Sequence, residues 1–200
     1  QNIRLNSISN LTFYGGTTFL FIVLFLRFWK DQFLDFKNKF VEYTVTIVVG
    51  FIGIYALQII FSMIYQLFNI GQSENQAALE DLLQGSLFDQ ISLIVFAVFM
   101  APLVEEMVFR FAIFRIGDML FNPEFWSEKH IKIVRWITMF VSAGLFGLIH
   151  VASGDMVQIF VYAGMGFLLA YLYHRTNNIL VPILAHFVLN GFVMILMFLI

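Results

Sequence analysis

The sequence contains no cysteine, only three prolines and few charged residues. Without cysteine there is no disulfide, no thiolate metal ligand and no cysteine nucleophile. Lys, Arg, Asp and Glu together make up 12% of the 200 residues, about half of their share in a soluble domain. Hydrophobic residues make up 60%, and the mean hydropathy is +0.87. The chain is therefore expected to be an integral membrane protein.

Six apolar runs predict an all-α fold, a polytopic membrane helix bundle in which residues 1–200 form a single membrane domain. A helix needs about 20 residues to cross a bilayer, and all but one of the runs come close to this length or exceed it. No basic n-region with a cleavage site precedes the first run, which is expected to remain as an anchor. The predicted spans are Leu11–Trp29, Tyr43–Phe68, Ile91–Leu120, Trp136–His150, Val157–Tyr173 and Ile179–Ile200.

Two segments between the spans are expected to lie on the membrane surface. Residues 30–39 mix Lys and Asp with Phe and Leu. Residues 69–90 carry acidic side chains and no Lys or Arg, and three leucines at helical spacing make the segment amphipathic. Residues 1–90 are thus predicted to form two transmembrane helices and a surface segment, with the functional core in residues 91–200.

The Lys and Arg residues alternate between the two sides that six spans define. Cytoplasmic loops are enriched in these residues, so the basic loops are expected in the cytoplasm and both termini outside. The loops after spans two and four contain no Lys or Arg. The loops after spans one, three and five contain Arg27, Lys30, Lys37, Lys39, Arg115, Lys129, Lys132, Arg135 and Arg175.

The middle of the third span carries three ionisable residues, Glu105, Glu106 and Arg110, in an otherwise apolar run. Each costs about 2.5 to 3.5 kcal/mol at the centre of a membrane helix, so their presence points to a polar interior and to a function. Glu106 and Arg110 are four residues apart and can pair across one turn. Glu105 is rotated by about 100° from Glu106 and has no such partner in its own helix. One carboxylate is therefore predicted to be paired and the other available for chemistry.

The fourth span ends in His150. Its 15 residues measure about 22 Å, less than a bilayer core of about 30 Å. His150 is therefore expected below the outer surface, at the start of an irregular link through Ser153. Gly144 and Gly147 are expected to permit close approach of a neighbouring helix.

The sixth span carries His186 and Asn190, which are four residues apart and share one helix face. Pro182, one turn earlier, can bend the helix. Either polar side chain alone could be an interhelical hydrogen bond. Together with the acids and His150, they predict one watered pocket, which requires Glu105 within about 8 Å of His150 or His186.

A pocket of His, Glu and Asn without Cys indicates hydrolysis by activated water, in either of two forms. In one, Glu105 is a general base, and His and Asn side chains donate hydrogen bonds to the oxyanion formed at a peptide carbonyl. In the other, two His and a Glu hold a divalent metal that activates water. The spacing fits both. Ser142 and Ser153 are less favoured as nucleophiles because neither lies in an elbow motif.

Three motifs occur in order on the membrane segments: Glu105-Glu106-x-x-x-Arg110, Phe146-x-x-x-His150 and His186-x-x-x-Asn190. As an ordered set on a polytopic background, they closely resemble the CAAX protease and bacteriocin-processing family, also called the Abi family. The resemblance covers about Ile91–Gly191. It implies an intramembrane endopeptidase that acts on a membrane-associated peptide or protein, and the eukaryotic members remove the last three residues of prenylated proteins.

The resemblance also implies roles for the matching residues. Glu105 would activate water with help from His150, and His186 and Asn190 would stabilise the oxyanion. The pair of Glu106 and Arg110 would fix the geometry of the site.

The family has been interpreted both as glutamic and as metal-dependent, and we favour the glutamic form without a cofactor. Asn190 would be an unusual zinc ligand, whereas His186 and Asn190 suit hydrogen-bond donors. In the metal-dependent alternative, a divalent ion such as zinc would be bound by Glu105, His150 and His186.

The expected location is the cell membrane, and the expected partners are the bilayer and a peptide or protein substrate, without nucleic acid. One alternative is a catalytically inactive scaffold or regulator of the same fold that binds another membrane protein. Bacterial relatives are also linked to bacteriocin self-immunity. A small transporter is disfavoured because no inverted repeat is evident.

Overall fold

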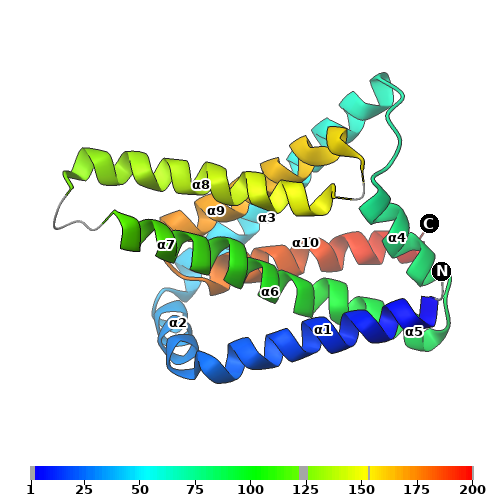
Figure 1. The fold of residues 1–200 in the computed structure, drawn as a ribbon, viewed down its shortest axis with the longest axis horizontal. Coiled ribbons are helices and arrows are strands. Elements are labelled where there is room, and N and C mark those ends of the chain that lie inside the picture. Colours follow the sequence, from blue (N-terminus) through cyan, green and yellow to red (C-terminus); the bar gives the residue numbers. More distant parts are fainter. Residues whose placement is uncertain (1–2, 122–125, 153, 200) are drawn as a thin grey trace.

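A computed structural model of the chain describes residues 3–121, 126–152 and 154–199. These residues form helices and no β-strand, which confirms the predicted all-α class (Figure 1). Within them, six helical stretches are long and apolar enough to cross a membrane, as the sequence predicts. They are Leu5–Leu24, Phe40–Leu67, Leu87–Leu120, Glu128–His150, Met156–Thr176 and Leu180–Leu199.

The first span begins and ends earlier than its apolar run suggests. Helix α1 covers Ile3–Leu24, whereas the sequence predicts Leu11–Trp29. Its polar first turns are accommodated because the buried hydroxyl of Ser7 donates to Oδ1 of Asp89 at 2.7 Å. A short break then leads into α2 (Leu26–Asn38), which forms the expected segment between the first two spans.

Helix α3 (Phe40–Leu67) is the second span, and α4 (Glu74–Leu83) is the helix expected in the acidic segment. The hydroxyl of Ser73 caps α4 by accepting a hydrogen bond from the backbone N–H of Gln76. Leu82 on the inner face of α4 is buried. The amphipathic pattern therefore predicts both the helix and its buried side.

The third span is one continuous helical stretch, but it is not α-helical throughout. Two π-helical turns interrupt it, one on either side of the acidic pair. The span starts four residues before the predicted Ile91, because Ser86 and Asp89 form a capping box there. Its segments are α5 (Leu87–Ile94), η1 (Val95–Met100), α6 (Ala101–Glu106), η2 (Met107–Ala112) and α7 (Ile113–Leu120).

The fourth span is longer than predicted. Helix α8 covers Glu128–His150, so its 23 residues measure about 34 Å and the expectation of a short span starting at Trp136 is wrong. The error arises because Lys129, Lys132 and Arg135 mask the helical start. The C-terminal end at His150 is as predicted.

The last two spans follow their predictions to within a few residues. A 3₁₀ turn, η3 (Met156–Gln158), leads into α9 (Ile159–Thr176), and α10 covers Leu180–Leu199. Two positions of the sequence analysis, Ser153 and Ile200, lie outside the described residues.

Helices α8 and α9 pack closely through one of the two glycines that were expected to permit it. A Cβ atom on Gly147 would lie 3.0 Å from the backbone nitrogen of Ala163 in α9. A Cβ atom on Gly144 would meet nothing within 4 Å, so the expectation for Gly144 is wrong. The two residues are three apart, and only Gly147 points at the neighbouring backbone.

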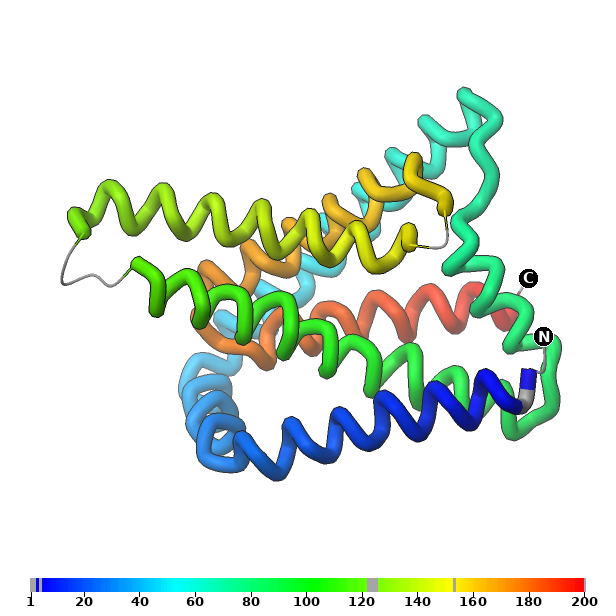
Figure 2. Tube along the Cα trace, in the orientation of Figure 1, coloured from blue at the N-terminus to red at the C-terminus, as the bar shows by residue number. Residues whose placement is uncertain are grey.

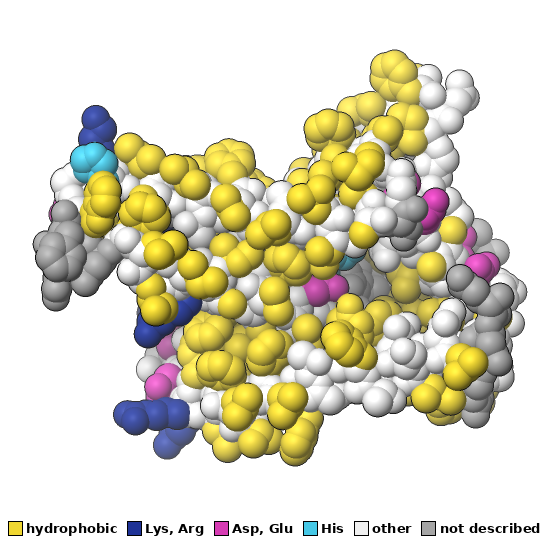
Figure 3. All heavy atoms as spheres, in the orientation of Figure 1, with side chains coloured by type: hydrophobic (Ala, Val, Ile, Leu, Met, Phe, Trp, Pro, Cys, Tyr) yellow, Lys and Arg dark blue, Asp and Glu magenta, His cyan; other side chains and the backbone are white. Residues whose placement is uncertain are grey.

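The two ends of the bundle differ in charge. Helix α2 and the connection from α7 to α8 lie at one end, while α4, the start of α1 and the end of α10 lie at the other (Figures 1 and 2). On the visible face, Lys and Arg side chains gather at the end that contains α2 (Figure 3). This is the arrangement that the alternation of basic loops requires.

A hydrogen-bonded corner fixes α2 against the turn between α9 and α10. The fully buried amide of Asn178 donates to the carbonyl of Gln32 and to Oδ2 of Asp35, at 2.8 and 2.9 Å. The side chain of Gln32 in turn accepts the backbone N–H of Ile179. Tyr43 also donates to Asp35 at 2.7 Å. These bonds fix where α10 starts, and thereby the level of the polar residues that α10 carries.

Candidate active site

The acidic pair lies at the C-terminal end of α6, between the two π-helical turns. Glu105 and Glu106 are the last residues of α6, and Arg110 lies in η2. Single π-helical turns within α-helices frequently occur at functional sites. The irregular backbone therefore coincides with the residues that the sequence singles out.

Glu106 and Arg110 form the predicted ion pair. Nη1 of Arg110 donates to Oε1 of Glu106 at 2.9 Å, and both side chains are fully buried. Arg110 also donates through Nη2 to the carbonyl of Gly166 in α9, and its guanidinium lies 4.6 Å from the centre of the Phe146 ring. The pair thus connects the third, fourth and fifth spans.

His186 joins the two acids. Its Nδ1 lies 2.9 Å from Oε1 of Glu106, and its Nε2 lies 3.9 Å from Oε2 of Glu105. Because Glu106 is ion-paired and can only accept, Nδ1 of His186 carries the proton of this hydrogen bond. Glu106 therefore fixes the ring so that Nε2 faces Glu105.

His150 lies near the second carboxylate oxygen of Glu105, the one that His186 does not approach. Its Nδ1 lies 2.8 Å from the carbonyl of Phe146, and its Nε2 lies 3.9 Å from Oε1 of Glu105. A carbonyl can only accept, so Nδ1 is protonated, and Nε2 of the neutral ring is a proton acceptor. The ring also stacks on Tyr162 of α9, with centroids 4.8 Å apart and planes at 21°.

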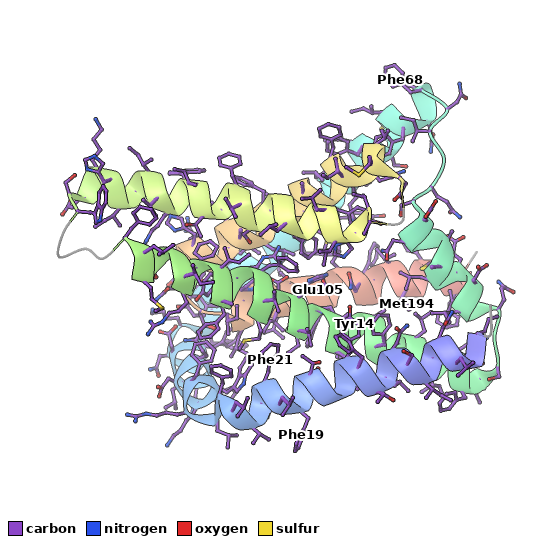
Figure 4. The ribbon with its side chains drawn as sticks, viewed as in Figure 1. Tyr14, Phe19, Phe21, Phe68, Glu105 and Met194 are labelled. Carbon is purple, nitrogen blue, oxygen red and sulfur yellow. The ribbon has the colours of Figure 1, made fainter. Side chains whose placement is uncertain are left out.

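Asn190 lies one turn beyond His186 in α10. Its Nδ2 donates to the carbonyl of Ala97 in η1 at 2.8 Å. The same cavity of about 580 Å³ is lined by Glu105, His150, His186 and Asn190. Figure 4 shows Glu105 in this region together with Tyr14 of α1, which lines the same cavity. The structure thus brings the four predicted catalytic residues together around one cavity, whereas Glu106 and Arg110 are not among its lining residues.

The two histidines meet although they come from opposite ends of their spans. His186 is six residues into α10, about 9 Å from its start, whereas His150 is the last residue of α8. Helix α8 is shifted towards the basic end because it begins at Glu128. Its last turn therefore lies beside Glu105, although the short span from which the sequence analysis placed His150 below the outer surface is not observed.

Ser142 is not placed to act as a nucleophile. Ser142 is fully buried and donates to the carbonyl of Phe109 at 2.7 Å, so its hydroxyl holds α8 against η2. Ser153 lies outside the described residues.

The site residues, as they are arranged, do not fit a zinc ion. Tetrahedral ligands about 2.0 to 2.1 Å from zinc lie about 3.3 Å from each other, whereas Nε2 of each histidine lies 3.9 Å from Glu105. Within the described residues, no three His, Asp or Glu side chains are close enough together to hold a metal ion.

Most of the other lining residues escaped the sequence analysis, and three of them lie close to the site or in a membrane span. Tyr14, Gln58 and Tyr162 line the cavity from α1, α3 and α9. Tyr14 and Tyr162 are inconspicuous in apolar spans because aromatic side chains are common there. Gln58 could have been noticed, because an amide within a span otherwise rich in Ile and Phe requires an explanation.

The fold and the site define a multi-pass helical membrane protein with one acid, two histidines and an asparagine around a cavity, and a second acid buried in an ion pair. The chain belongs to the family of type II CAAX prenyl endopeptidases described as Rce1-like, whose profile matches residues 87–192, slightly more than half of the chain. This match confirms the family resemblance seen in the three motifs. No solved structure matches the chain.

Several bacterial proteins are similar in sequence. YdiL of Bacillus subtilis is 33% identical over 147 residues, which are 73% of this chain and 52% of YdiL. The membrane-embedded CAAX protease MroQ of Staphylococcus aureus is 41% identical over 103 residues, 51% of this chain and 38% of MroQ. YaiF of Lactococcus lactis is 27% identical over 183 residues, 90% of this chain and 74% of YaiF. The chain thus spans about half the length of YdiL and less of MroQ.

Proposed function

We propose that the chain is an intramembrane endopeptidase that hydrolyses a peptide bond with a water molecule activated by Glu105. The observation that carries the proposal is the position of this carboxylate, whose two oxygens each lie 3.9 Å from Nε2 of a different histidine. Its side chain is 12% exposed and faces the cavity, whereas Glu106 is fully buried in its ion pair. Only Glu105 can therefore reach a substrate.

In the proposed first step, Glu105 removes a proton from a water whose second proton is bound by Nε2 of His150. The water oxygen attacks the carbonyl carbon, and the carbonyl oxygen becomes an oxyanion. In the second step the C–N bond breaks, and Glu105 returns its proton to the leaving amine. The products are a carboxyl group and an amine, so the enzyme ends as it began.

His186 and Asn190 are proposed to stabilise the oxyanion. This role requires a proton on both ring nitrogens of His186, so that Nδ1 donates to Glu106 and Nε2 donates into the cavity. The amide of Asn190 has a second N–H besides the one bound to Ala97. Removal of one such donor typically lowers kcat by about 10² to 10³.

The test is cleavage by the purified protein in detergent, with a farnesylated CAAX peptide and the same peptide without the prenyl group as probes. Glu105→Gln removes the base with little change of shape, and Glu128→Gln is its matched control on the exposed first turn of α8. We expect Glu105→Gln and His150→Ala to abolish cleavage of at least one probe, Asn190→Ala to reduce kcat, and Glu128→Gln to act as wild type. Cleavage that survives Glu105→Gln would overturn the mechanism.

A cellular test separates the enzyme from a scaffold of the same fold. The Glu105→Gln variant should lose the phenotype of the wild-type gene while it accumulates to the same level in the membrane. A variant that keeps the full phenotype would favour the scaffold.

A further inference from the structure

The cavity extends beyond the catalytic centre along helix α3. Gln58, Ser62 and Gln66 are spaced four residues apart, so they lie on one face of the helix, and all three line the cavity. We call them the polar stripe. It lies outside residues 87–192, which match the family, so it belongs to the part of the chain that the shared motifs do not explain.

Gln58 lacks a strong partner for a polar side chain in a membrane span. Among the described residues, its amide nitrogen contacts the sulfur of Met165 at 4.0 Å, and a thioether is a weak acceptor. Gln58 is half-buried and lines the cavity, so its amide is open to hydrogen bonds from a ligand that enters there. Gln58 is therefore placed to bind a ligand rather than to hold helices together.

Another part of the cavity lining is apolar. Leu79 of α4 and Met194 and Met197 of α10 line it, beside the polar Asn75 and Gln76 of α4. Among the described lining residues, Glu105 is the only acid, and none is Lys or Arg. An anion bound beside the polar stripe would therefore have no Lys or Arg to neutralise it, and a cation would have only Glu105. An isoprenoid chain there would leave the amides without hydrogen bonds.

We propose that the polar stripe is a subsite for an extended, uncharged peptide segment on one side of the scissile bond. This inference rests on the proposed function of the same cavity. Side-chain amides carry both a donor and an acceptor, so they complement the N–H and C=O groups of a peptide backbone. Residues 58 to 66 cover about 12 Å of helix, the length of three to four extended residues. Side chains on the other face of the peptide would contact Met194 and Met197.

The first experiment varies the peptide. Acetylated and amidated peptides of about ten residues, built from Ala, Ser, Asn and Val, are compared with the same peptides carrying two Glu or two Lys within four residues of the cleaved bond. Mass spectrometry of the products locates the bond. We expect charges on one side of it to reduce cleavage at least about ten-fold, since each buried charge is costly. Equal cleavage of charged and neutral peptides would overturn the proposal.

The second experiment varies the protein. Gln58→Leu and Ser62→Ala should each raise KM about five-fold, the value of one hydrogen bond, with kcat nearly unchanged. Thr46→Val is the matched control, because Thr46 lies on α3 away from the cavity and its hydroxyl bonds to the carbonyl of Glu42. An unchanged KM in both stripe variants would refute the subsite.

A binding measurement separates the subsite from catalysis. In the Glu105→Gln variant, a neutral peptide with a benzophenone group should crosslink to α3, and Gln58→Leu should weaken this crosslink. If the crosslink forms but the wild type cleaves no peptide, the proposed function fails and the subsite stands. If the wild type cleaves peptides that crosslink only elsewhere, the subsite fails and the function stands.

Discussion

Nδ1 of His186 lies 2.9 Å from Oε1 of Glu106, the same oxygen that Nη1 of Arg110 binds at 2.9 Å. The histidine is thus oriented by a carboxylate that is itself held by a buried arginine. Glu106 therefore contributes both to the stability of the bundle, through Arg110, and to the geometry of the site, through His186. Mutations can separate these two contributions.

Arg110→Met should destabilise the protein by about 3 to 5 kcal/mol, because it leaves the buried charge of Glu106 without its main partner. The double variant Glu106→Gln with Arg110→Met should recover much of this loss, since no uncompensated charge remains. It should still be inactive, because a neutral amide at position 106 fails to hold His186 as the carboxylate does. Thermal unfolding in detergent and a cleavage assay measure the two effects. A double variant less stable than Arg110→Met would contradict this account.

Tyr162 should act as a positioning residue for His150. Its ring stacks on the imidazole, and its hydroxyl lies 2.7 Å from that of Ser73 before α4. Tyr162→Phe keeps the stack, so it should retain most of the activity. Tyr162→Leu removes the stack and should lower kcat more than it raises KM. Phe at the same position should restore kcat. Equal activity of the Leu and Phe variants would indicate that the stacking has no role.

Gly147→Ala should destabilise the packing of α8 on α9 by about 1 to 3 kcal/mol, because the new Cβ meets backbone that cannot move aside. Gly144→Ala is the matched control. It meets open space and should be neutral or stabilising by up to about 1 kcal/mol, the helix propensity difference. Melting temperatures of both variants test this contrast, and equal shifts would contradict it.

The corner that holds α2 should respond to acid. Burial acts to raise the pKa of Asp35, but hydrogen bonds from Asn178, Tyr43 and Lys39 outweigh it and hold the pKa below 3.8. Because the pKa of Asp35 is lowered in the folded state, this carboxylate stabilises the protein above pH 3.8. The contribution is lost as the pH falls below 3.8 and through the lowered pKa. Asp35→Asn should therefore be less stable than wild type at neutral pH, and the gap between them should narrow below 3.8. A gap that is constant with pH would contradict the assignment.

The absence of cysteine allows a direct test of orientation. With basic loops in the cytoplasm, the link before α4 faces outward, and its residues Gly71, Gln72 and Ser73 line the cavity. In intact cells, an impermeant maleimide should label Gln72→Cys but not Lys30→Cys, since both positions are exposed at opposite ends of the bundle. Labelling of Lys30→Cys alone would invert the topology.

The sequence predicts the six helices because hydrocarbon tolerates little else over such runs. The sequence analysis misplaces the start of α8. Lysine and arginine residues at the end of a helix are interpreted as a loop when only hydropathy is considered. The pairing of Glu106 with Arg110 follows from spacing alone. The contact of His186 with Glu106 does not, because it depends on the relative height of two spans, which the Asn178 corner sets through long-range hydrogen bonds.

The π-helical turns and the polar stripe show a second limit. Apolar periodicity does not distinguish an α-helical turn from a π-helical one, because both bury the same residue types. Gln58 is noticeable in the sequence because it is an amide in an apolar span. The cavity that it lines, however, is formed with α4, α9 and α10, which only the folded chain brings together.

The two π-helical turns that flank the acids bear on how such a centre could arise. A π turn accommodates one residue more than the α-helical turn it replaces. Deleting a single amino acid from η1 would thus restore a regular helix, and the segments on either side would keep their relative orientation because the π turn already absorbs the extra residue. Single-codon insertions into an ordinary membrane helix are therefore a short evolutionary route to a widened turn beside a carboxylate, without loss of the packing on either side.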